Sequence, residues 1–468
     1  SAASDVYKRQ TLNKVSYTYG AYSQLLEKTY HQDENTIITV QNQLTSDSKN
    51  IAQSRIISSR DGLMQCDDCA YDSHGNMTRD AKYKGTAGNY EWIYYTYDSK
   101  GMYLAEVKQN NITNKMEYDA LGNVTKTTDG NGNTVTYTYD KYGNQTGSND
   151  GKYKTRNVYD YAGNNVAYYD ENNKGTFYDY NVIGQLLNVK DMATGKILAE
   201  YTYDKKNLMV NSATIGNKSK LSIVYNTFDE IYSREITDPN NSNTVLYKEV
   251  YERNLNNTDY QEIVTKIGDG SYSTVSRLDL DGYETYSKVN GVETTYTVDM
   301  LGNTLTSITD GVTTKMEYDG LGNMLKLTRP KGGVYKYGYD TLGRKISETA
   351  PDGGITTFEY DDSNRLIKEC APMGSNSQKS EKKYTYDNNG NVKTESVKTN
   401  TVGSSAATYR TTNYNYDAKN NLIKVQNIDN SVNQCYTEYE YDGVGNILKQ
   451  KAANGENVTS YTYDSQNF

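Results

Sequence analysis

Residues 115–123 read KMEYDALGN, and residues 315–323 read KMEYDGLGN. Eight of the nine positions are identical. A stretch that recurs this closely is either a duplicated binding site or a structural unit. The rest of the sequence decides between the two, because a structural unit should recur many more times in register.

The Tyr-Asp pair of this stretch marks a tandem repeat. Within runs the aspartate slots lie 21 residues apart, as from Asp98 to Asp119. Tyrosine precedes the slot in 14 of 16 copies, and the third residue after it is glycine in 12 copies and asparagine in four (Asn207, Asn364, Asn420 and Asn467). The slot is occupied by Asp72, Asp98, Asp119, Asp140, Asp160, Asn181, Asp204, Asp279, Asp299, Asp319, Asp340, Asp361, Asp387, Asp417, Asp442 and Asp464.

The spacing of these residues predicts a hairpin turn. Glycine and asparagine tolerate a positive φ better than other residues, so the third position after the slot should be left-handed. An aspartate followed by such a residue is typical of a type I turn closed by a bulge. The flanks alternate with a period of two, as in Tyr137-Thr138-Tyr139, which indicates strands. Each unit is therefore a β-hairpin of about 20–21 residues, and second turns such as residues 129–134 and 351–356 join one unit to the next.

We therefore expect an all-β fold of tandem antiparallel hairpins, with roughly 35–40 strands in one long sheet. Accumulated strand twist should wind the sheet as a spiral or a large open shell, and its tyrosine-rich face should be covered. In each turn, tyrosine should anchor a strand face, aspartate should open the turn, and glycine should take the left-handed bend. The one mismatch, Ala120 against Gly320, falls at a turn position where side-chain identity should matter little. The best-kept copies supply Tyr118, Asp119, Gly122, Tyr139, Asp140, Gly143, Tyr318, Asp319, Gly322, Tyr339, Asp340, Gly343, Tyr441, Asp442 and Gly445.

The repeat divides the chain into segments of different regularity. Residues 1–10 lack a signal-peptide pattern and resemble a translated adapter sequence, so we leave them out of the fold prediction. We expect a degenerate repeat region at 11–70, regular repeats at 71–204, diverged repeats at 205–277, and regular repeats at 278–468 that are cut off within a unit. In the diverged part Asp229 and Glu252 lie at plausible slot spacing, although Tyr232 and Leu255 stand three residues later.

The unit resembles the YD repeat of rearrangement-hotspot (Rhs) proteins, bacterial wall-associated proteins, toxin-complex shell proteins and teneurins. The copies that carry the resemblance are YTYDKYGN (137–144), YDGLGNML (318–325), YDTLGRKI (339–346) and YDGVGNIL (441–448). The resemblance implies a hollow β-shell that, in the bacterial toxins, encloses a C-terminal toxic polypeptide. Other members act in adhesion at cell surfaces, with carbohydrate binding proposed for the repeats.

The family's Pro-rich element, which follows the repeats and carries a self-cleaving site, is absent from these residues. We therefore expect a wall segment of a large secreted or cell-surface protein, from a fragment of a longer chain. Its partner would be an encapsulated C-terminal effector. The alternative is an adhesin that binds glycans through tyrosine and asparagine.

Composition limits the other function classes. The net charge of −9 argues against nucleic-acid binding, and no run of about 18 apolar residues predicts a membrane span. With only His31 and His74, a Ser-His-Asp triad has little to draw on, and we expect no enzymatic activity. The 49 tyrosines should mainly stack with neighbouring strands as cross-strand ladders rather than bind sugars.

Three small clusters could hold a metal ion. Cys66 and Cys69, followed by His74, leave three alternatives open: a zinc site, a local disulfide, or free thiols. The loops that begin at Asp129 and Asp279 suggest calcium ligands, but neither has the full spacing of a calcium loop, and hairpin turns explain the same residues. We therefore expect neither a metal nor a cofactor.

Overall fold

The computed structural model describes residues 15–463, except 33–34, 86–88, 217, 242–243, 255–259, 269–271, 374–378, 400–407, 429–435 and 453–454. Residues 1–10, the last slot at Asp464, and Asn467 lie outside the described residues. No α-helix occurs in the described ranges, so none of them contains a helix that could cross a membrane.

The described residues form 39 strands, which confirms the all-β prediction and falls within the expected number. The first half comprises β1 Ser16–Tyr19, β2 Leu25–His31, β3 Ile37–Leu44, β4 Ile51–Ser58, β5 Gly62–Tyr71, β6 Met77–Tyr83, β7 Tyr90–Tyr97, β8 Leu104–Gln109, β9 Ile112–Tyr118, β10 Val124–Thr128, β11 Thr134–Tyr139, β12 Gln145–Asn149, β13 Lys154–Tyr159, β14 Asn165–Tyr169, β15 Gly175–Tyr180, β16 Leu186–Asp191, β17 Ile197–Tyr203, β18 Val210–Ile215, β19 Ser219–Tyr225 and β20 Ile231–Asp238. The second half comprises β21 Thr244–Asn254, β22 Gln261–Ile267, β23 Tyr272–Leu278, β24 Glu284–Val289, β25 Val292–Val298, β26 Thr304–Thr309, β27 Val312–Tyr318, β28 Met324–Thr328, β29 Val334–Tyr339, β30 Lys345–Thr349, β31 Ile355–Tyr360, β32 Leu366–Pro372, β33 Lys379–Tyr386, β34 Val392–Thr399, β35 Thr408–Tyr416, β36 Leu422–Ile428, β37 Tyr436–Tyr441, β38 Ile447–Ala452 and β39 Asn457–Ser460.

Each strand pairs antiparallel with the next strand along the chain, so the sheet is one continuous meander. The register shifts by one residue at the tyrosine that ends the strand before a repeat turn, as between Thr138 and Tyr139. This recurring bulge is the bend that the repeat pattern predicts, and bulges increase local strand twist. The sheet therefore curves in the same direction unit after unit.

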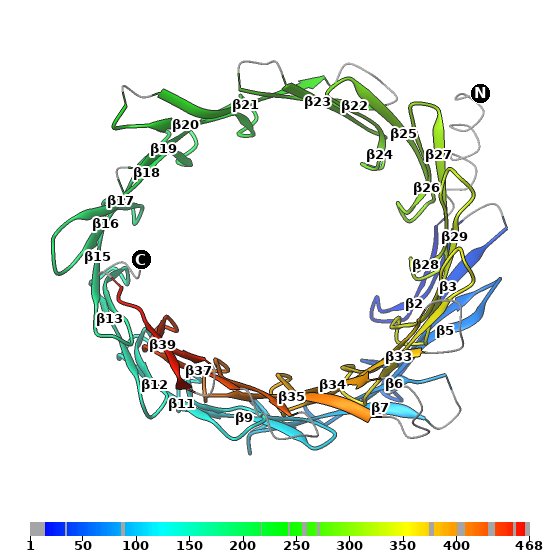
Figure 1. Cartoon of the computed structure of the whole chain (residues 1–468), viewed down its shortest axis with the longest axis horizontal. Coiled ribbons are helices and arrows are strands. Elements are labelled where there is room, and N and C mark those ends of the chain that lie inside the picture. Colours follow the sequence, from blue (N-terminus) through cyan, green and yellow to red (C-terminus); the bar gives the residue numbers. More distant parts are fainter. Residues whose placement is uncertain are drawn as a thin grey trace.

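The curved sheet winds into an open spiral (Figure 1). It runs as a single layer around the centre of the view and passes more than once around it, so that β2–β7 lie beside β28–β34. We call residues 15–298 the first coil and residues 299–463 the second coil. The two coils meet edge to edge along part of their length, as the contacts described below show.

No second layer of the described residues covers the tyrosine-rich face of the sheet (Figure 1). The ribbon is one layer thick, and the tyrosines of the strands are shielded mainly by side chains of neighbouring strands. The rings of Tyr103 and Tyr118 stack at 4.9 Å, and the guanidinium of Arg156 lies 3.7 Å from the ring centre of Tyr169. Tyrosine and long cationic side chains thus form the hydrophobic layer that a larger apolar core would otherwise supply.

The diverged stretch 205–277 continues the same sheet through strands β18–β23. Neither expected slot residue is at a slot. Asn226 opens the turn, with Asp229 at the left-handed third position (φ 61), and Glu252 lies within β21, where it pairs with Val264. The slot at Asn226 was missed although Tyr225 precedes it, as in the asparagine copy at Asn181. The third residue after it is Asp229, whereas the pattern requires glycine or asparagine there.

Candidate functional site: the repeat turns and the seam between coils

Asp119 shows how the repeat turn is built. Its Oδ1 accepts hydrogen bonds from the backbone N–H groups of Leu121 and Asn123, both at 2.9 Å. The Asn123 side chain donates to Oδ2 at 2.9 Å, and this bond, together with the backbone donors, lowers the pKa of Asp119. Gly122 has a φ of 90°. Both carboxylate oxygens are therefore occupied by the turn itself.

The other best-kept copies have the same arrangement. Asp140, Asp319, Asp340 and Asp442 each accept the N–H groups two and four residues on, at 2.8–3.1 Å. Tyr118, Tyr139, Tyr318, Tyr339 and Tyr441 end strands β9, β11, β27, β29 and β37, and Gly143, Gly322, Gly343 and Gly445 have φ values between 76° and 95°. These residues form repeated structural turns and do not converge on one centre.

The left-handed position follows the sequence pattern with one exception among the described copies. All twelve glycines at this offset have a positive φ, as do Asn364 and Asn420. The prediction for Asn207 was wrong, because Leu208 takes the left-handed conformation there (φ 59). The Asp204 turn is one residue longer, since its closing hydrogen bond joins Asp204 to Met209 instead of to the fourth residue.

The fourth residue after the slot complements the slot residue, a rule that we did not infer from sequence. Where the slot is aspartate, the fourth residue often donates, as Asn123 does and as Arg344 does to Asp340 at 2.7 Å. Where the slot is Asn181, its amide donates instead to Gln185 Oε1 at 2.7 Å. The slot residue and the fourth residue after it change together between copies, and this pairing was visible in the sequence.

The tyrosine hydroxyls have a bonding role that sequence reasoning also missed. Tyr139 donates its hydroxyl to the backbone carbonyl of Val124 at 2.7 Å. Val124 begins β10 and precedes the residues that pair with β11, so the hydroxyl satisfies a carbonyl beyond the end of that ladder. Equivalent bonds run from Tyr71 to Ile51, Tyr97 to Met77, Tyr118 to Leu104, Tyr159 to Gln145, Tyr180 to Asn165, Tyr203 to Leu186, Tyr225 to Val210, Tyr360 to Lys345, Tyr386 to Leu366, Tyr416 to Val392, Tyr441 to Leu422 and Tyr463 to Ile447.

The sheet has two different edges because repeat turns and linking turns alternate along the chain. We call the edge with the Asp-slot turns the repeat-turn edge, and the edge with the turns between units the linker-turn edge. Where the coils meet, the linker-turn edge of the first coil contacts the repeat-turn edge of the second coil. We call this contact the seam.

Direct hydrogen bonds join the seam. Arg60 donates to the carbonyl of Tyr318 at 2.9 Å, Thr341 donates to the carbonyl of Tyr83 at 2.8 Å, and Asn388 donates to the carbonyl of Gly130 at 3.0 Å. In each of these pairs the two residues are 258 positions apart, so the spiral repeats after about that length of chain. Further along, Asn172 donates to Asp442 Oδ2 at 2.9 Å.

The seam explains the mismatch between Ala120 and Gly320. A Cβ atom on Gly320 would lie 2.2 Å from Cδ1 of Ile38 and 2.9 Å from the sulfur of Met64, and Ile38 is completely buried. Ala120 is at the same turn position in the first coil, where it is exposed. The expectation that side-chain identity matters little at this position was therefore wrong for the second coil, because the turn is packed against another segment of the chain.

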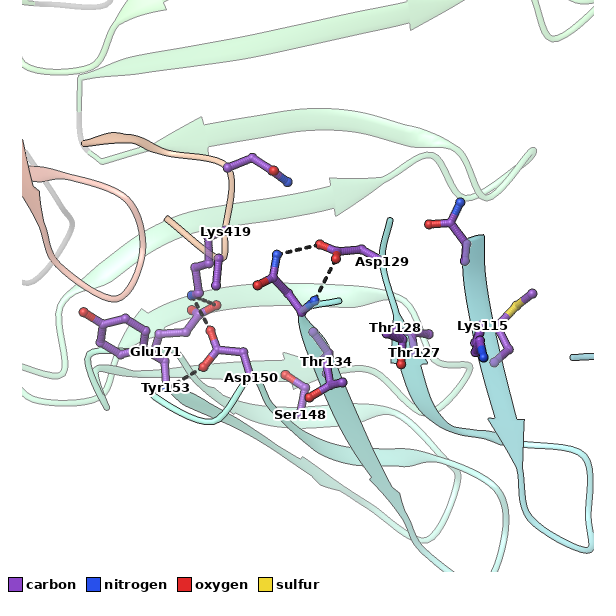
Figure 2. Close-up of a pocket in the computed structure, with 16 residues that line it drawn as sticks. Lys115, Thr127, Thr128, Asp129, Thr134, Ser148, Asp150, Tyr153, Glu171 and Lys419 are labelled. Carbon is purple, nitrogen blue, oxygen red and sulfur yellow. Dashed lines mark hydrogen bonds and ion pairs between the residues drawn. The ribbon is translucent and has the colours of Figure 1, made fainter. Parts of the chain in front are cut away.

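A pocket of 530 Å³ lies on the seam, and Figure 2 shows its lining. Lys419 of the second coil points toward two carboxylates of the first coil, at 3.5 Å from Asp150 Oδ2 and 3.3 Å from Glu171 Oε1. Its ammonium group also donates to the carbonyl of Gly443 and lies 4.8 Å from the ring centre of Tyr153. Lys419 therefore acts as a clamp across the seam.

Burial alone would raise the pKa of Asp150, but backbone N–H donors and Lys419 lower it. In the same pocket, Asp129 was a candidate calcium ligand. Its Oδ1 accepts the N–H groups of Asn131 and Asn133, and its Oδ2 accepts the side chains of Asn133 and Asn389. Its oxygens are thus occupied by turn and seam hydrogen bonds.

The Cys66 and Cys69 thiols are free in this structure. They are three residues apart in β5, so they point to opposite faces of the sheet. Burial raises the pKa of both thiols, which disfavours the reactive thiolate. His74 lies in its repeat turn with its side chain 61% exposed, and no metal-binding group of three His, Cys, Asp or Glu side chains occurs in the part of the chain that the structure describes.

Comparison with known proteins identifies the repeat. Residues 118–155, 318–355 and 339–369 match the RHS repeat family. The chain therefore contains RHS repeats. Over 201 residues this Rhs-repeat chain is 28% identical to the tRNA3(Ser)-specific nuclease WapA of Bacillus spizizenii, a match that covers 40% of the chain and 8% of WapA.

Solved toxin structures share the fold. A crystal structure of TcdB2-TccC3-Cdc42 matches with a TM-score of 0.59 and 13% identity over 96% of the Rhs-repeat chain and 29% of the matched chain. The Photorhabdus luminescens Tc holotoxin pore matches with a TM-score of 0.57 and 14% identity, over 92% of this chain and 27% of that one. The Rhs-repeat chain thus spans less than a third of these relatives.

Proposed function

We propose that this chain is a wall segment of a secreted or cell-surface Rhs shell that encloses a C-terminal effector polypeptide. The observation that carries the proposal is the seam. A single-layer spiral can enclose a polypeptide only if successive coils are joined, and side-chain and backbone hydrogen bonds join the coils here. The matched Tc toxin structures and the nuclease WapA support the same role by similarity.

We propose a structural role for the repeat residues themselves. The carboxylates of the repeat turns are held by their own backbone and by neighbouring side chains, which lower the pKa of Asp119, Asp140 and Asp160. A general acid needs a raised pKa, and two carboxylates need different environments to divide acid and base roles. In the repeated turns the carboxylates have a lowered pKa and the same surroundings from copy to copy.

Limited proteolysis of the product of the uninterrupted gene tests enclosure. If the shell encloses an effector, the sequence after the repeats resists protease while the seam is intact and is cleaved when Gly320 is replaced by leucine. Replacement of Ala120 by leucine is the matched control, because that turn has no seam partner among the described residues and should leave protection unchanged. Equal cleavage in wild type and in the Gly320 variant would contradict enclosure. Glycan adhesion is the competing proposal, and binding of residues 15–463 to a glycan array would favour it.

A further inference from the structure

Two turns that meet at the seam each have an asparagine directly before a glycine. Asn131 precedes Gly132 in the linking turn between β10 and β11, and Asn389 precedes Gly390 in the repeat turn between β33 and β34. The side-chain amide of asparagine is lost most readily before glycine, because a glycine without Cβ does not hinder attack by its own backbone nitrogen. Both sides of one contact therefore contain a chemically reactive side chain.

The two side-chain amides bind the opposite coil reciprocally. Asn131 Nδ2 donates to Oδ2 of Asp387 at 3.1 Å. Asn389 Nδ2 donates to Oδ2 of Asp129 at 2.7 Å. The side-chain oxygens are used as well, since Asn131 Oδ1 accepts the N–H of Asn388 at 3.0 Å and Asn389 Oδ1 accepts the N–H of Asn131 at 3.2 Å. Burial alone would raise the pKa of Asp129 and Asp387, but side-chain and backbone donors, these amides among them, lower it.

We propose that Asn131 and Asn389 are deamidation sites, and that their conversion to aspartate opens this part of the seam for good. In the first step the backbone nitrogen of the following glycine attacks the side-chain carbonyl carbon. A carbon–nitrogen bond forms, the attacking nitrogen gives up its proton, and the side-chain nitrogen leaves as ammonia, so that a cyclic imide remains. Water then adds to one carbonyl of the imide and opens the ring to a carboxylate, as aspartate or isoaspartate. The net change exchanges ammonia for water and needs no other reactant.

The closed seam slows this reaction. The N–H of Gly132 donates to the carbonyl of Asp129 at 3.0 Å, and the N–H of Gly390 donates to the carbonyl of Asp387 at 3.2 Å, so each attacking nitrogen is held in its own turn. The contacts with the opposite coil hold the asparagine side chains at the same time. Attack therefore requires that the contact first open. Gly132 and Gly390 are exposed, so water reaches both turns.

The product cannot form the same contact again. An aspartate at position 131 has no donor for Oδ2 of Asp387, and it brings a second negative charge to a place where the amide lies 3.1 Å away. The same holds at position 389, where the amide lies 2.7 Å from Oδ2 of Asp129. Two carboxylates this close repel one another unless they share a proton. A brief opening thus becomes a lasting one, whatever the shell encloses.

Hydrogen exchange of the full chain tests the effect of the product. Asn131→Asp and Asn389→Asp should each lower the protection of the amides in residues 129–133 and 387–391 at least about tenfold. High salt should restore part of the loss, because it screens the new repulsion. Asn290→Asp is the matched control, since Asn290 also precedes a glycine but lies in an exposed turn with no hydrogen bond to the second coil among the described residues. It should leave the protection of both turns unchanged.

Peptide mapping by mass spectrometry, after incubation at mildly alkaline pH, tests the reaction itself. In wild type, Asn290 should deamidate at least about tenfold faster than Asn131, because no contact has to open first. Asn389→Ala removes the amide that binds Asp129 and should raise the rate at Asn131 at least about fivefold.

Two outcomes would overturn the proposal. They are aspartate variants that keep the protection of wild type, and a rate at Asn131 that is the same in wild type and in the Asn389→Ala variant. If an aspartate variant fails to fold, aged wild type decides instead. Molecules deamidated at position 131 or 389, separated by ion exchange, should have lost protection in both turns, whereas molecules deamidated only at position 290 should not.

Discussion

Replacement of Gly320 by alanine separates a packing role from a conformational one. Gly320 does not have a positive φ, so the backbone there accepts alanine. At such positions glycine-to-alanine stabilises a protein by about 0.4–1 kcal/mol, because the unfolded chain loses freedom. If the turn were an isolated hairpin corner, the Gly320→Ala variant would be more stable than wild type.

The seam reverses this expectation. The added Cβ would lie 2.2 Å from Cδ1 of Ile38, and Ile38 is completely buried and cannot turn toward solvent. Overpacking of this kind costs about 1–3 kcal/mol. The difference between the two ranges is a net loss of about 0–2.6 kcal/mol in the free energy of opening the seam. Hydrogen exchange of the amides around Ile38 and Gly320 measures this local opening, which suits a repeat sheet better than one global unfolding midpoint.

A second substitution identifies the clash. Ile38→Val removes Cδ1 at a cost of about 0.5–1.5 kcal/mol on its own. In the double variant the alanine no longer meets that atom, so the two losses should sum to more than the measured loss by at least about 0.5 kcal/mol. Ala120→Gly in the uncovered coil is the matched control and should leave opening of the seam unchanged. A Gly320→Ala variant that is stabilised, or strictly additive losses in the double variant, would refute the packing argument.

Three further predictions follow from the turns and the seam. Tyr139→Phe removes the hydroxyl that satisfies the Val124 carbonyl and should cost about 1–2 kcal/mol in urea unfolding, whereas Tyr142→Phe, at an exposed turn, should cost nothing measurable. Lys419→Met should loosen the seam by at most about 1 kcal/mol, because the ion pairs are partly exposed, and the loss seen by hydrogen exchange should shrink at high salt; a loss independent of salt would contradict an electrostatic clamp. The turn aspartates have a folded pKa below the unfolded value of about 3.9, so they add stability above that pH and lose it as pH falls through that value toward the folded pKa. Thermal melts should therefore fall steeply below about pH 4, and Asp140→Asn should reduce this acid dependence; an unchanged acid profile would contradict the assignment to that turn.

The sequence contains the local structure nearly completely. A glycine or asparagine lies three residues after Asp119, Asp361 and Asp417. One such residue is weak evidence for a left-handed turn position, but its recurrence in many copies predicts that position, because every copy of the turn requires the left-handed backbone. Period-two patterns likewise locate the strands, since each hairpin is stabilised by contacts close in sequence. The turn at Asp204 was predicted wrongly because its left-handed residue is Leu208 and not Asn207. Turn length alone does not explain this, since the Asp98 turn is equally long and keeps Gly101 left-handed.

The seam could not be read from the repeat. Its contacts join residues about 258 positions apart, and the offset depends on how strongly each hairpin bends relative to the last, a property summed over many bulges. The one visible sign was a small residue where other copies have larger ones. Gly320 and Gly443 both occupy the first position after the slot, and both lie where another coil leaves no room for a Cβ. When the copies of the repeat are aligned, such a glycine looks like neutral variation. In the assembled spiral it is a contact residue of the seam.

The two unlike edges also limit how such a chain can change in length during evolution. Recombination between near-identical copies readily adds or removes a hairpin, and each new hairpin would fit its immediate neighbours. A hairpin gained inside the first coil would, however, displace every later partner along the seam, so that Gly320 would no longer face Ile38. Selection should therefore tolerate substitutions along the strands but conserve the number of hairpins in one full circuit. Viable length variants should differ by a complete circuit or by units added outside the overlap of the two coils.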